Sequence, residues 1–343
     1  MVLNPDSLFA KAVSAGASDV HVVVGQPPLL RIDGELAPQG TQTVTKSAAE
    51  SFVKSVLGAT GFAKLKELRE LDTAFTLKSG ARLRVNCHYE RGNVGLAARV
   101  IPREIPSLED VGFTELLMEL CALDEGLVLF TGPTGAGKST SLAAMIQHVN
   151  ATRATNIVTL EDPIEFLFPS GKSIIRQREY GADFLSFPEA LKHVLRQDPN
   201  IVMVGEMRDH ETIAAALTLA ETGHVILATL HTPNAVQAVD RIIDVFPPHQ
   251  QAQVRTQLSL SLRAVVAQRL VPGAKSGRIA VRECLVATPA VANIIRENRA
   301  QELTSVLQSG RAQGMCTFAQ DARRLLKEGS IDKETYEWVE AIA

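Results

Sequence analysis

Residues 132–140, with the sequence GPTGAGKST, could do the chemistry of phosphate binding. They match the pattern G-x-x-x-x-G-K-[ST], in which glycines let backbone N–H groups converge on phosphate oxygens at the start of a helix. Lys138 would reach the β- and γ-phosphates, and Ser139 would ligate Mg²⁺. An apolar strand precedes the loop and a helical apolar stripe follows it, so a glycine-rich turn that binds nothing is a poor explanation. The predicted nucleotide contacts in this loop are Gly132, Pro133, Thr134, Gly135, Ala136, Gly137, Lys138, Ser139 and Thr140.

Carboxylates follow two other apolar runs, and hydrolysis needs them to activate water and to organise a metal. The run IVMVGE has the shape of a Walker B element, an apolar strand that ends in an acid. Gly205 stands where such an element usually has Asp, so Glu206 is the only acid at the tip, and we expect it to organise Mg²⁺ through water. The segment TLEDPIE places Glu161, Asp162 and Glu165 after another run. Solvated loop charges remain the alternative for these three. Strand ends that share an edge with the phosphate loop favour a functional role, because open α/β sheets bind ligands there.

Histidine and arginine supply the remaining candidates. His231 follows the run VILATL and could sense the γ-phosphate or orient water, whereas His224 precedes that run. A structural role is the alternative for both. Arg82, Arg84 and Arg99 fall on a predicted hairpin, where they form a solvated face or contact phosphate. In the second case an arginine finger can raise the rate by about 10³–10⁵.

Two different arrangements of elements would position these groups. Residues 1–101 read as a small α+β domain, with helices at 6–15, 47–56 and 61–70, strands at 21–24 and 29–32, and a hairpin of 82–89 with 94–101. Residues 102–112 contain two prolines and are predicted to be a linker. Strands at 127–131, 156–160, 201–204 and 225–230 then alternate with helices through an ATPase core at 113–287, as in a parallel sheet buried on both faces. A helical region is predicted for 288–343.

Composition narrows the class of protein. The 343 residues are 45% hydrophobic and carry a net charge of −3, so no global positive field attracts nucleic acid or anionic lipid. The four cysteines, at positions 87, 121, 284 and 316, form no C-x-x-C pair, which argues against a zinc site or a disulfide framework and suits a reducing cytoplasm. We find no signal peptide, and no apolar run approaches the roughly 20 residues needed to span a bilayer.

Several of these motifs together resemble a known family. GPTGAGKST, TLEDPIEF, IVMVGEMRD and ETGHVILATLHT look like the Walker A, Asp box, Walker B and His box of secretion-superfamily ATPases. Their order and the flanking segments ASDVHVVVGQPPLLRIDGEL, RIIDVFPPHQQAQVRTQLSLSL and ATPAVANIIRE most closely resemble the PilT-type ATPases of type IV pilus retraction and twitching motility. The last segment follows the family's AIRNLIRE-like motif only loosely. The extra N-terminal domain and tetracysteine insert of extension and type II secretion relatives are not found.

The resemblance implies a PAS-like N-terminal domain joined to a RecA-like P-loop core, assembled as a homohexamer that uses ATP and Mg²⁺. It implies that Glu165 activates water, that Glu206 supports Mg²⁺, and that His224 and His231 are the His-box pair. It also implies that Arg84 and Arg99 approach nucleotide phosphates. The implied partners are an inner-membrane platform protein and, as a further candidate, a paralogous retraction ATPase. The implied location is the cytoplasm, peripherally associated with the inner face of the cytoplasmic membrane.

Other functions remain open at this point. An accessory retraction motor or a type II-like secretion ATPase would carry the same motifs. A RecA-like nucleic-acid translocase is disfavoured by the net negative charge and by the lack of a cluster of basic and aromatic residues. A regulatory subunit that binds nucleotide without hydrolysis is disfavoured by the intact set of Lys138, Ser139, Glu165 and Glu206.

Overall fold

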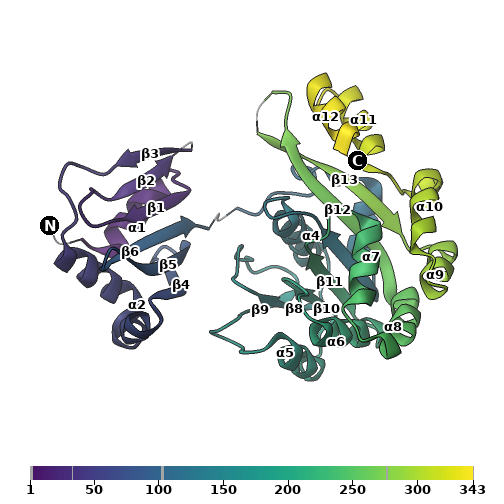
Figure 1. The fold of residues 1–343 in the computed structure, drawn as a ribbon, viewed down its shortest axis with the longest axis horizontal. Coiled ribbons are helices and arrows are strands. Elements are labelled where there is room, and N and C mark those ends of the chain that lie inside the picture. Colours follow the sequence, from purple (N-terminus) through teal and green to yellow (C-terminus); the bar gives the residue numbers. More distant parts are fainter. Residues whose placement is uncertain (1–2, 33, 102–103, 276, 343) are drawn as a thin grey trace. The chain divides into compact units, whose positions relative to one another are not determined.

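The computed structural model describes residues 3–32, 34–101, 104–275 and 277–342. The chain forms two compact units that divide after Glu104, and each is described here by itself. Both units combine helices with a sheet, which confirms the predicted α/β class (Figure 1). The domain bounds given above stay a prediction, and residues 102–103 of the predicted linker lie outside the described residues.

The smaller unit contains a six-stranded antiparallel sheet in the order β3-β2-β1-β6-β5-β4. Helices α1 (Pro5–Ser14) and α2 (Lys46–Leu68) share one apolar core with it. Phe9 of α1 meets Phe52 of α2 and Phe75 of β4 edge-on, at 5.7 and 5.2 Å between ring centroids. The strands are β1 (Asp19–Val22), β2 (Leu29–Ile32), β3 (Glu35–Pro38), β4 (Glu70–Thr76), β5 (Arg82–Glu90) and β6 (Asn93–Val100).

The predicted hairpin is present as β5 and β6, but the region before it differs from the prediction. The two helices predicted at 47–56 and 61–70 correspond to α2, which is broken at Gly58 by a non-helical backbone (φ 68°, ψ 179°). The helix ends at Leu68 rather than at residue 70. Arg69 takes a left-handed conformation, and β4 then pairs with β5 from Glu70 opposite His88. Strands β3 and β4 were not predicted.

The larger unit contains a seven-stranded sheet in the order β13-β12-β7-β11-β10-β8-β9. The strands from β12 to β9 run parallel, and β13 is antiparallel to β12. The four predicted apolar strands are confirmed as β7, β8, β10 and β11, whereas β9, β12 and β13 were not predicted. The bounds are β7 (Gly126–Thr131), β8 (Asn156–Glu161), β9 (Ile174–Glu179), β10 (Ile201–Val204), β11 (Val225–Leu230), β12 (Leu262–Pro272) and β13 (Arg278–Val286).

Helices cover both faces of this sheet, which explains its near-continuous apolar strands. In β7, Leu127 and Leu129 contact one layer and Val128 and Phe130 the other, because successive side chains point to opposite faces. One layer contains α3 (Glu115–Glu119) and α4 (Lys138–Thr152). The other contains α5 (Phe187–Val194), α6 (His210–Glu221), α7 (Ala235–Asp244), α8 (Pro248–Ser261), α9 (Pro289–Arg296) and α10 (Leu303–Ser309).

The C-terminal region is helical, as predicted. Helices α11 (Phe318–Lys327) and α12 (Lys333–Ile342) pack on Ala267, Val271 and Val281 of β12 and β13. Short 3₁₀ turns complete the unit at Leu120–Ala122, Leu195–Gln197, Ala300–Glu302 and Gly310–Gln313. Within the described residues, none of the helices is long and apolar enough to cross a membrane.

Candidate active site

The phosphate loop connects β7 to α4, which begins at Lys138. Gly132, Gly135 and Gly137 take positive φ angles of 141°, 78° and 81°. A side chain at Gly132 would collide with the Gln268 backbone, and one at Gly137 would lie 2.8 Å from the Gln268 side-chain nitrogen. Glycine is therefore needed both for the left-handed backbone and for the close approach of β12. The strand–loop–helix context predicted for residues 132–140 is present.

The Lys138 ammonium lies over this loop, where Nζ donates to the carbonyl oxygens of Gly132 (2.6 Å) and Pro133 (3.1 Å). Its side chain is buried, with 8% exposure. Burial lowers the pKa of Lys138, and the charges of Glu206 and Glu165 act in the opposite direction. Both predicted carboxylates are thus within electrostatic reach of the loop lysine.

The other candidate groups lie along the same edge of the sheet. Strands β7, β11, β10 and β8 are successive parallel neighbours, with Thr131 opposite Leu230, and Val204 opposite both Ala228 and Leu160. The phosphate loop, His231, Glu206 and the segment 161–165 all follow the carboxyl ends of these strands. This is the edge at which open α/β sheets bind ligands.

Glu206 is held between Arg208 and His231. The Nε and Nη2 atoms of Arg208 lie 2.8 and 2.7 Å from Glu206 Oε2, and His231 Nε2 lies 3.3 Å from Oε1. Arg208 Nη1 also lies 3.7 Å from Asp162. These two partners orient the Glu206 carboxylate. The side chain is still 26% exposed, so the carboxylate remains open to solvent.

The glycine before Glu206 is explained by packing between strands. A side-chain carbon at Gly205 would lie 3.1 Å from the Leu160 carbonyl oxygen and 3.3 Å from the Glu161 Cα. The Gly205 carbonyl in turn accepts a hydrogen bond from the Thr229 hydroxyl. An Asp at this position would crowd β8, so Glu206 is the acid that the tip of β10 presents.

The acids after β8 have different environments. Glu161 is buried, and it accepts hydrogen bonds from Thr159 Oγ1 (2.6 Å), Gln177 Nε2 (3.1 Å) and the Glu165 backbone. Burial raises the pKa of Glu161 to about 7, although these hydrogen bonds oppose the shift. Glu161 is therefore not a solvated loop charge. Asp162 and Glu165 are exposed, and Glu165 extends from a backbone that Glu161 anchors.

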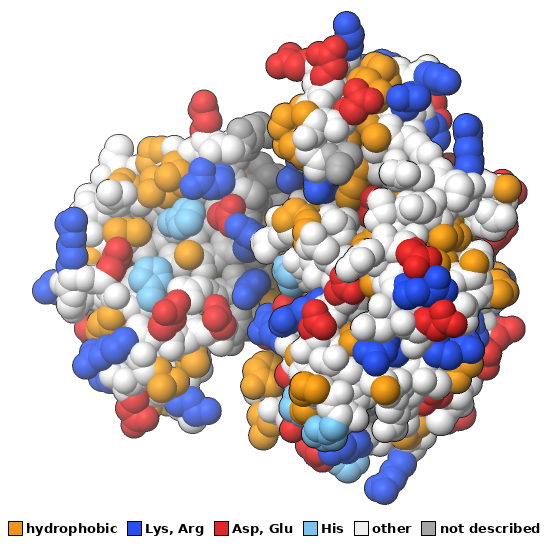
Figure 2. Space-filling view, turned by 45° about the vertical axis from the view of Figure 1, so that its right-hand side comes forward, with side chains coloured by type: hydrophobic (Ala, Val, Ile, Leu, Met, Phe, Trp, Pro, Cys, Tyr) orange, Lys and Arg blue, Asp and Glu red, His pale blue; other side chains and the backbone are white. Residues whose placement is uncertain are grey.

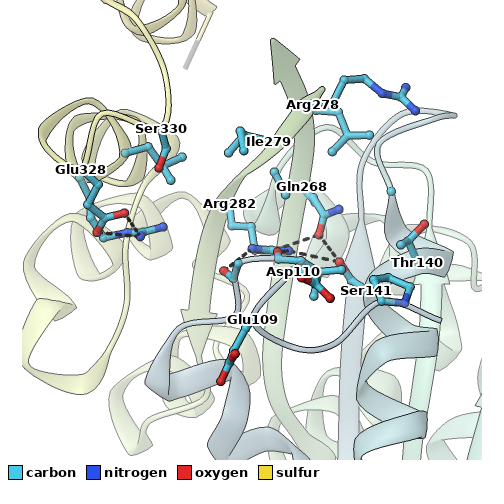
Figure 3. Close-up of a pocket in the computed structure, with 18 residues that line it drawn as sticks. Glu109, Asp110, Thr140, Ser141, Gln268, Arg278, Ile279, Arg282, Glu328 and Ser330 are labelled. Atoms are coloured by element: carbon cyan, nitrogen blue, oxygen red, sulfur yellow. Dashed lines mark hydrogen bonds and ion pairs between the residues drawn. The ribbon is translucent and has the colours of Figure 1, made fainter. Parts of the chain in front are cut away.

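A cavity of about 590 Å³ opens beside the phosphate loop and was not predicted from the sequence. Figure 3 shows Thr140 and Ser141 of α4, Gln268 of β12 and Arg278 of β13 around it, with Glu109 on the segment before the core. Leu270 and Ile279 add apolar surface. Polar and charged side chains make up most of the remaining lining. A cavity of this size next to a phosphate loop can hold the base and sugar of a nucleotide.

Arg282 and Gln268 connect this cavity to the loop. Gln268 Nε2 donates to the Ala136 carbonyl (2.6 Å), while its Oε1 accepts from Arg282 Nε (3.0 Å) and Ser141 Oγ (2.9 Å). Arg282 Nη1 and Nη2 donate to the carbonyls of Gly112 (2.8 Å) and Val111 (2.6 Å). Both side chains are buried, and Figure 3 marks the hydrogen bonds that join Gln268, Arg282 and Ser141. The signal in the sequence was the presence of polar residues inside two mainly apolar runs, AVVAQRLV and RIAVRECLV.

A second cavity of about 390 Å³ lies on the acidic side of the site. Asp162, Glu206 and Arg208 line it together with Tyr180 and Phe187. It shares these carboxylates with the candidate active site.

One predicted nucleotide contact, His224, is not brought to the loop. His224 precedes β11, at the sheet edge opposite to the loop, and its Nδ1 lies 3.0 Å from the Leu219 carbonyl. Arg84 and Arg99 are cross-strand partners in the smaller unit, and Arg99 Nε donates to Asp19 at 3.0 Å. Contact between either arginine and a nucleotide stays a prediction.

Comparisons with known proteins agree with this geometry. A model of the family described as type II/IV secretion system protein matches residues 3–337. The type IV pilus retraction ATPase PilT of Pseudomonas aeruginosa is 40% identical over 327 residues, which are 95% of each chain. The type IV pilus ATPase PilU of the same organism is also 40% identical, over 97% of this chain and 86% of its own. A crystal structure of the pilus retraction motor PilT with bound ADP superimposes with a TM-score of 0.91 at 40% identity, covering 98% of this chain and 97% of that one.

Proposed function

The chain belongs to the family of type II/IV secretion system proteins, and we propose that it is an ATP-hydrolysing hexameric motor that powers type IV pilus retraction. The observation that carries the proposal is the shared sheet edge. There the phosphate loop, Glu165 and the Glu206–His231 pair follow neighbouring parallel strands. The likeness to a pilus retraction motor over nearly the whole chain supports the same function.

Each group at the edge has a role that its environment supports. The N–H groups of residues 134–138 and the start of α4 bind the phosphates, and Lys138 shifts from the loop carbonyls to the phosphate oxygens. The exposed Glu165 carboxylate accepts a proton from the attacking water. His231 faces the γ-phosphate, and its contact with Glu206 holds the imidazole ring in one orientation.

The residues present fit Mg²⁺. Ser139 offers a hydroxyl in the first turn of α4, and Glu206 offers a carboxylate that is open to solvent and held in orientation. Oxygen donors of this kind, completed by water and phosphate, are what Mg²⁺ prefers. When bound, the ion would neutralise charge that develops on the phosphates.

The cavity beside the loop completes the nucleotide site. A base placed there would lie against Leu270 and Ile279, with its sugar near Thr140. Because Pro106 and residues 109–112 form one wall, bound nucleotide would contact the segment that leads into the core. This gives nucleotide turnover a direct mechanical connection to that segment.

Work on a pilus requires partners. The proposed assembly is a homohexamer that acts on an inner-membrane platform protein from the cytoplasmic side, with peripheral attachment to the membrane. The similarity to PilT and PilU is equal in identity, so an accessory retraction motor is the second candidate. Twitching and pilus-retraction assays of a deletion strain would separate the two roles.

A nucleic-acid translocase is less well supported. The net charge is −3, and Figure 2 shows acidic and basic side chains interspersed over the face in view. Proteins that track single strands combine a positive groove with stacking aromatics. Stimulation of ATP hydrolysis by single-stranded DNA would favour this function over the motor.

The deciding experiment measures ATP hydrolysis across a size-exclusion profile for wild type, Glu165→Gln and Lys138→Ala. Wild-type activity should elute with a hexamer-sized peak. Glu165→Gln should still bind ATP but turn over at least ~10²-fold more slowly, the usual contribution of a general base. Lys138→Ala should abolish hydrolysis, because the loop loses its only cation.

A matched control is Glu189→Gln, which removes an exposed carboxylate of α5 that pairs with Lys192 at 2.6 Å. It should hydrolyse ATP at the wild-type rate. Activity in a monomer-sized peak would argue against the ring, and a Glu165→Gln variant as fast as wild type would remove Glu165 from the mechanism.

A further inference from the structure

Cys284 and Cys316 meet across an isolated antiparallel bridge. The Cys284 N–H donates to the Cys316 carbonyl at 2.9 Å, and the Cys316 N–H returns a bond to the Cys284 carbonyl at 3.2 Å. Directly opposed residues bonded in this way have Cα atoms about 5.5 Å apart. Disulfides span Cα separations of about 4.4–6.8 Å. The two thiols are also hydrogen-bonded to each other, so they already lie side by side.

We propose that Cys284 and Cys316 are an oxidant-sensitive thiol pair, which a peroxide converts into an intramolecular disulfide. Cys284 belongs to β13 and Cys316 lies just before α11, with helices α9 and α10 between them in the sequence. This modification site is independent of the proposed motor function.

The two cysteines differ in exposure and in thiol pKa, so each is suited to a different step of the oxidation. Cys316 is half-buried, whereas Cys284 is 2% exposed. The hydrogen bond that the two thiols share raises the pKa of Cys284 and lowers that of Cys316. The Cys316 thiol also donates to the Arg282 carbonyl oxygen at 3.7 Å. The nearby charge of Arg324 favours the Cys316 thiolate and that of Asp321 opposes it. Sensor cysteines are commonly accessible, low in pKa and placed beside a resolving thiol.

The chemistry then balances in two steps. The Cys316 thiolate attacks a peroxide oxygen, forming an S–O bond and breaking the O–O bond, and the released hydroxide takes a proton to become water. The Cys284 sulfur next attacks the Cys316 sulfenic acid, so that the S–S bond forms and the S–O bond breaks. The leaving oxygen takes the Cys284 proton and departs as a second water. Two thiols and one hydrogen peroxide thus give one disulfide and two waters.

The remaining cysteines provide an internal comparison. Cys87 lies in the core of the smaller unit and Cys121 in a core layer of the larger one. Burial raises the pKa of each thiol to about 12. A buried thiol that stays protonated reacts slowly with peroxide, so oxidation should be confined to the pair.

Closure of the disulfide would also restrain the cavity beside the phosphate loop. Arg282 of β13 and Arg324 of α11 both line this cavity. A covalent bond between Cys284 and Cys316 would tie the two elements together at the point where α11 begins. The expected consequence is slower hydrogen exchange in α11 in the oxidised protein than in the reduced protein.

The test treats the folded full-length protein with hydrogen peroxide, alkylates free thiols, and maps peptides without reduction. We expect one peptide pair linked through Cys284 and Cys316, a mass lower by about 2 Da before alkylation, alkylated Cys87 and Cys121, and full reversal by dithiothreitol. Free thiols at positions 284 and 316 after treatment, or a disulfide that joins two chains, would overturn the proposal.

Variants assign the two roles. Cys284→Ser should leave Cys316 as a sulfenic acid that dimedone traps, whereas Cys316→Ser should leave Cys284 as a free thiol. Cys87→Ser is the matched control and should form the disulfide as wild type does. Trapping of Cys284 rather than Cys316 would reverse the order of attack and contradict the mechanism. The wild-type mapping tests the pair itself even where a variant folds poorly.

Discussion

Among single residues, Glu161 shows how one acid can serve the site without touching the reaction. Its carboxylate is buried at the end of β8 and accepts the backbone N–H of Glu165, the proposed general base. Thr159 and Gln177 hold it from the other sides. A buried acid with a pKa raised to about 7 takes up a proton on folding at mildly acidic pH. The stability of the fold should therefore depend on pH through this one group.

The sign of the dependence follows from the two pKa values. In the unfolded chain Glu161 ionises near 4.5, while in the fold it ionises near 7. Between these values the folded state binds the extra proton, so stability falls as pH rises through the window and levels off above it. The loss is roughly 3–4 kcal/mol at most, since the pKa shift from 4.5 to about 7 is multiplied by about 1.4 kcal/mol per unit.

Glu161→Gln should not show this loss, because the amide does not ionise. Denaturant unfolding of wild type and variant between pH 4.5 and 8 measures the difference. The variant should gain stability relative to wild type as pH rises to about 7. Glu179→Gln serves as a control, because it changes another buried acid of the same unit. Parallel stability curves for wild type and Glu161→Gln would show that Glu161 ionises normally in the fold.

At the scale of elements, β13 carries a buried arginine that connects the phosphate loop to residues 111–112. Arg282 reaches two carbonyls of that segment and orients Gln268, whose amide holds the loop at Ala136. Arg282 is thus a positioning residue rather than a catalytic one. A lysine could keep the charge but could not reproduce this planar set of donors.

Arg282→Lys should lower the free energy of unfolding by roughly 1–3 kcal/mol, because it leaves buried carbonyls without donors. It should also raise the KM for ATP more than it lowers kcat, since the loop is displaced while Glu165 and Glu206 remain. Steady-state kinetics and denaturant unfolding give both values. The control is Arg269→Lys on β12, an arginine that packs over the Phe318 ring. A fall in kcat at unchanged KM would instead mean that Arg282 acts on the chemical step.

The elements that sequence analysis predicted are those whose signal is local. The strands β7, β8, β10 and β11 are continuous apolar runs, and the loop at residues 132–140 is a contiguous motif. Strand β9 has the sequence IIRQRE and is the outermost strand of the sheet, next to β8 alone. Its exposed polar residues interrupt the apolar run by which a buried strand is recognised. Strand β12 begins directly after α8 with no glycine or proline between them. Such boundaries are set by pairing with distant strands rather than by nearby residues.

The same distinction applies to the site. Lys138, Glu165, Glu206 and His231 were predicted because each belongs to a recognisable motif, and the structure places them along one sheet edge. Gln268 and Arg282 were missed because their environment depends on contacts with residues more than 100 positions away in sequence, at Ala136 and Val111. Cys284 and Cys316 likewise show no useful spacing, and only the bridge between them reveals the pair.

At the scale of the whole molecule, the proposed hexameric ring leads to a prediction about coupling between subunits, which cannot be tested on a single subunit. If turnover at one site depends on movement of a neighbouring subunit, an inactive subunit should also silence neighbours that have intact sites. Lys138→Ala provides such a subunit, because it removes the loop cation while leaving the surface of the protein nearly unchanged. Rings that combine wild-type and Lys138→Ala subunits should therefore lose activity faster than the fraction of wild-type subunits falls.

Differently tagged subunits, co-expressed in known ratios and purified through both tags, allow this measurement. At equal amounts, independent sites would retain half of the wild-type rate. In the limit where all six subunits must act, these rings would be inactive, because each ring that is retained on both tags contains at least one Lys138→Ala subunit. The rate should lie between these limits. Mixing with Lys78→Ala, a change at an exposed residue of the smaller unit, should leave the rate unaltered. A strictly linear fall with Lys138→Ala would mean that the subunits hydrolyse ATP independently, and mechanical coupling around the ring would then have to be abandoned.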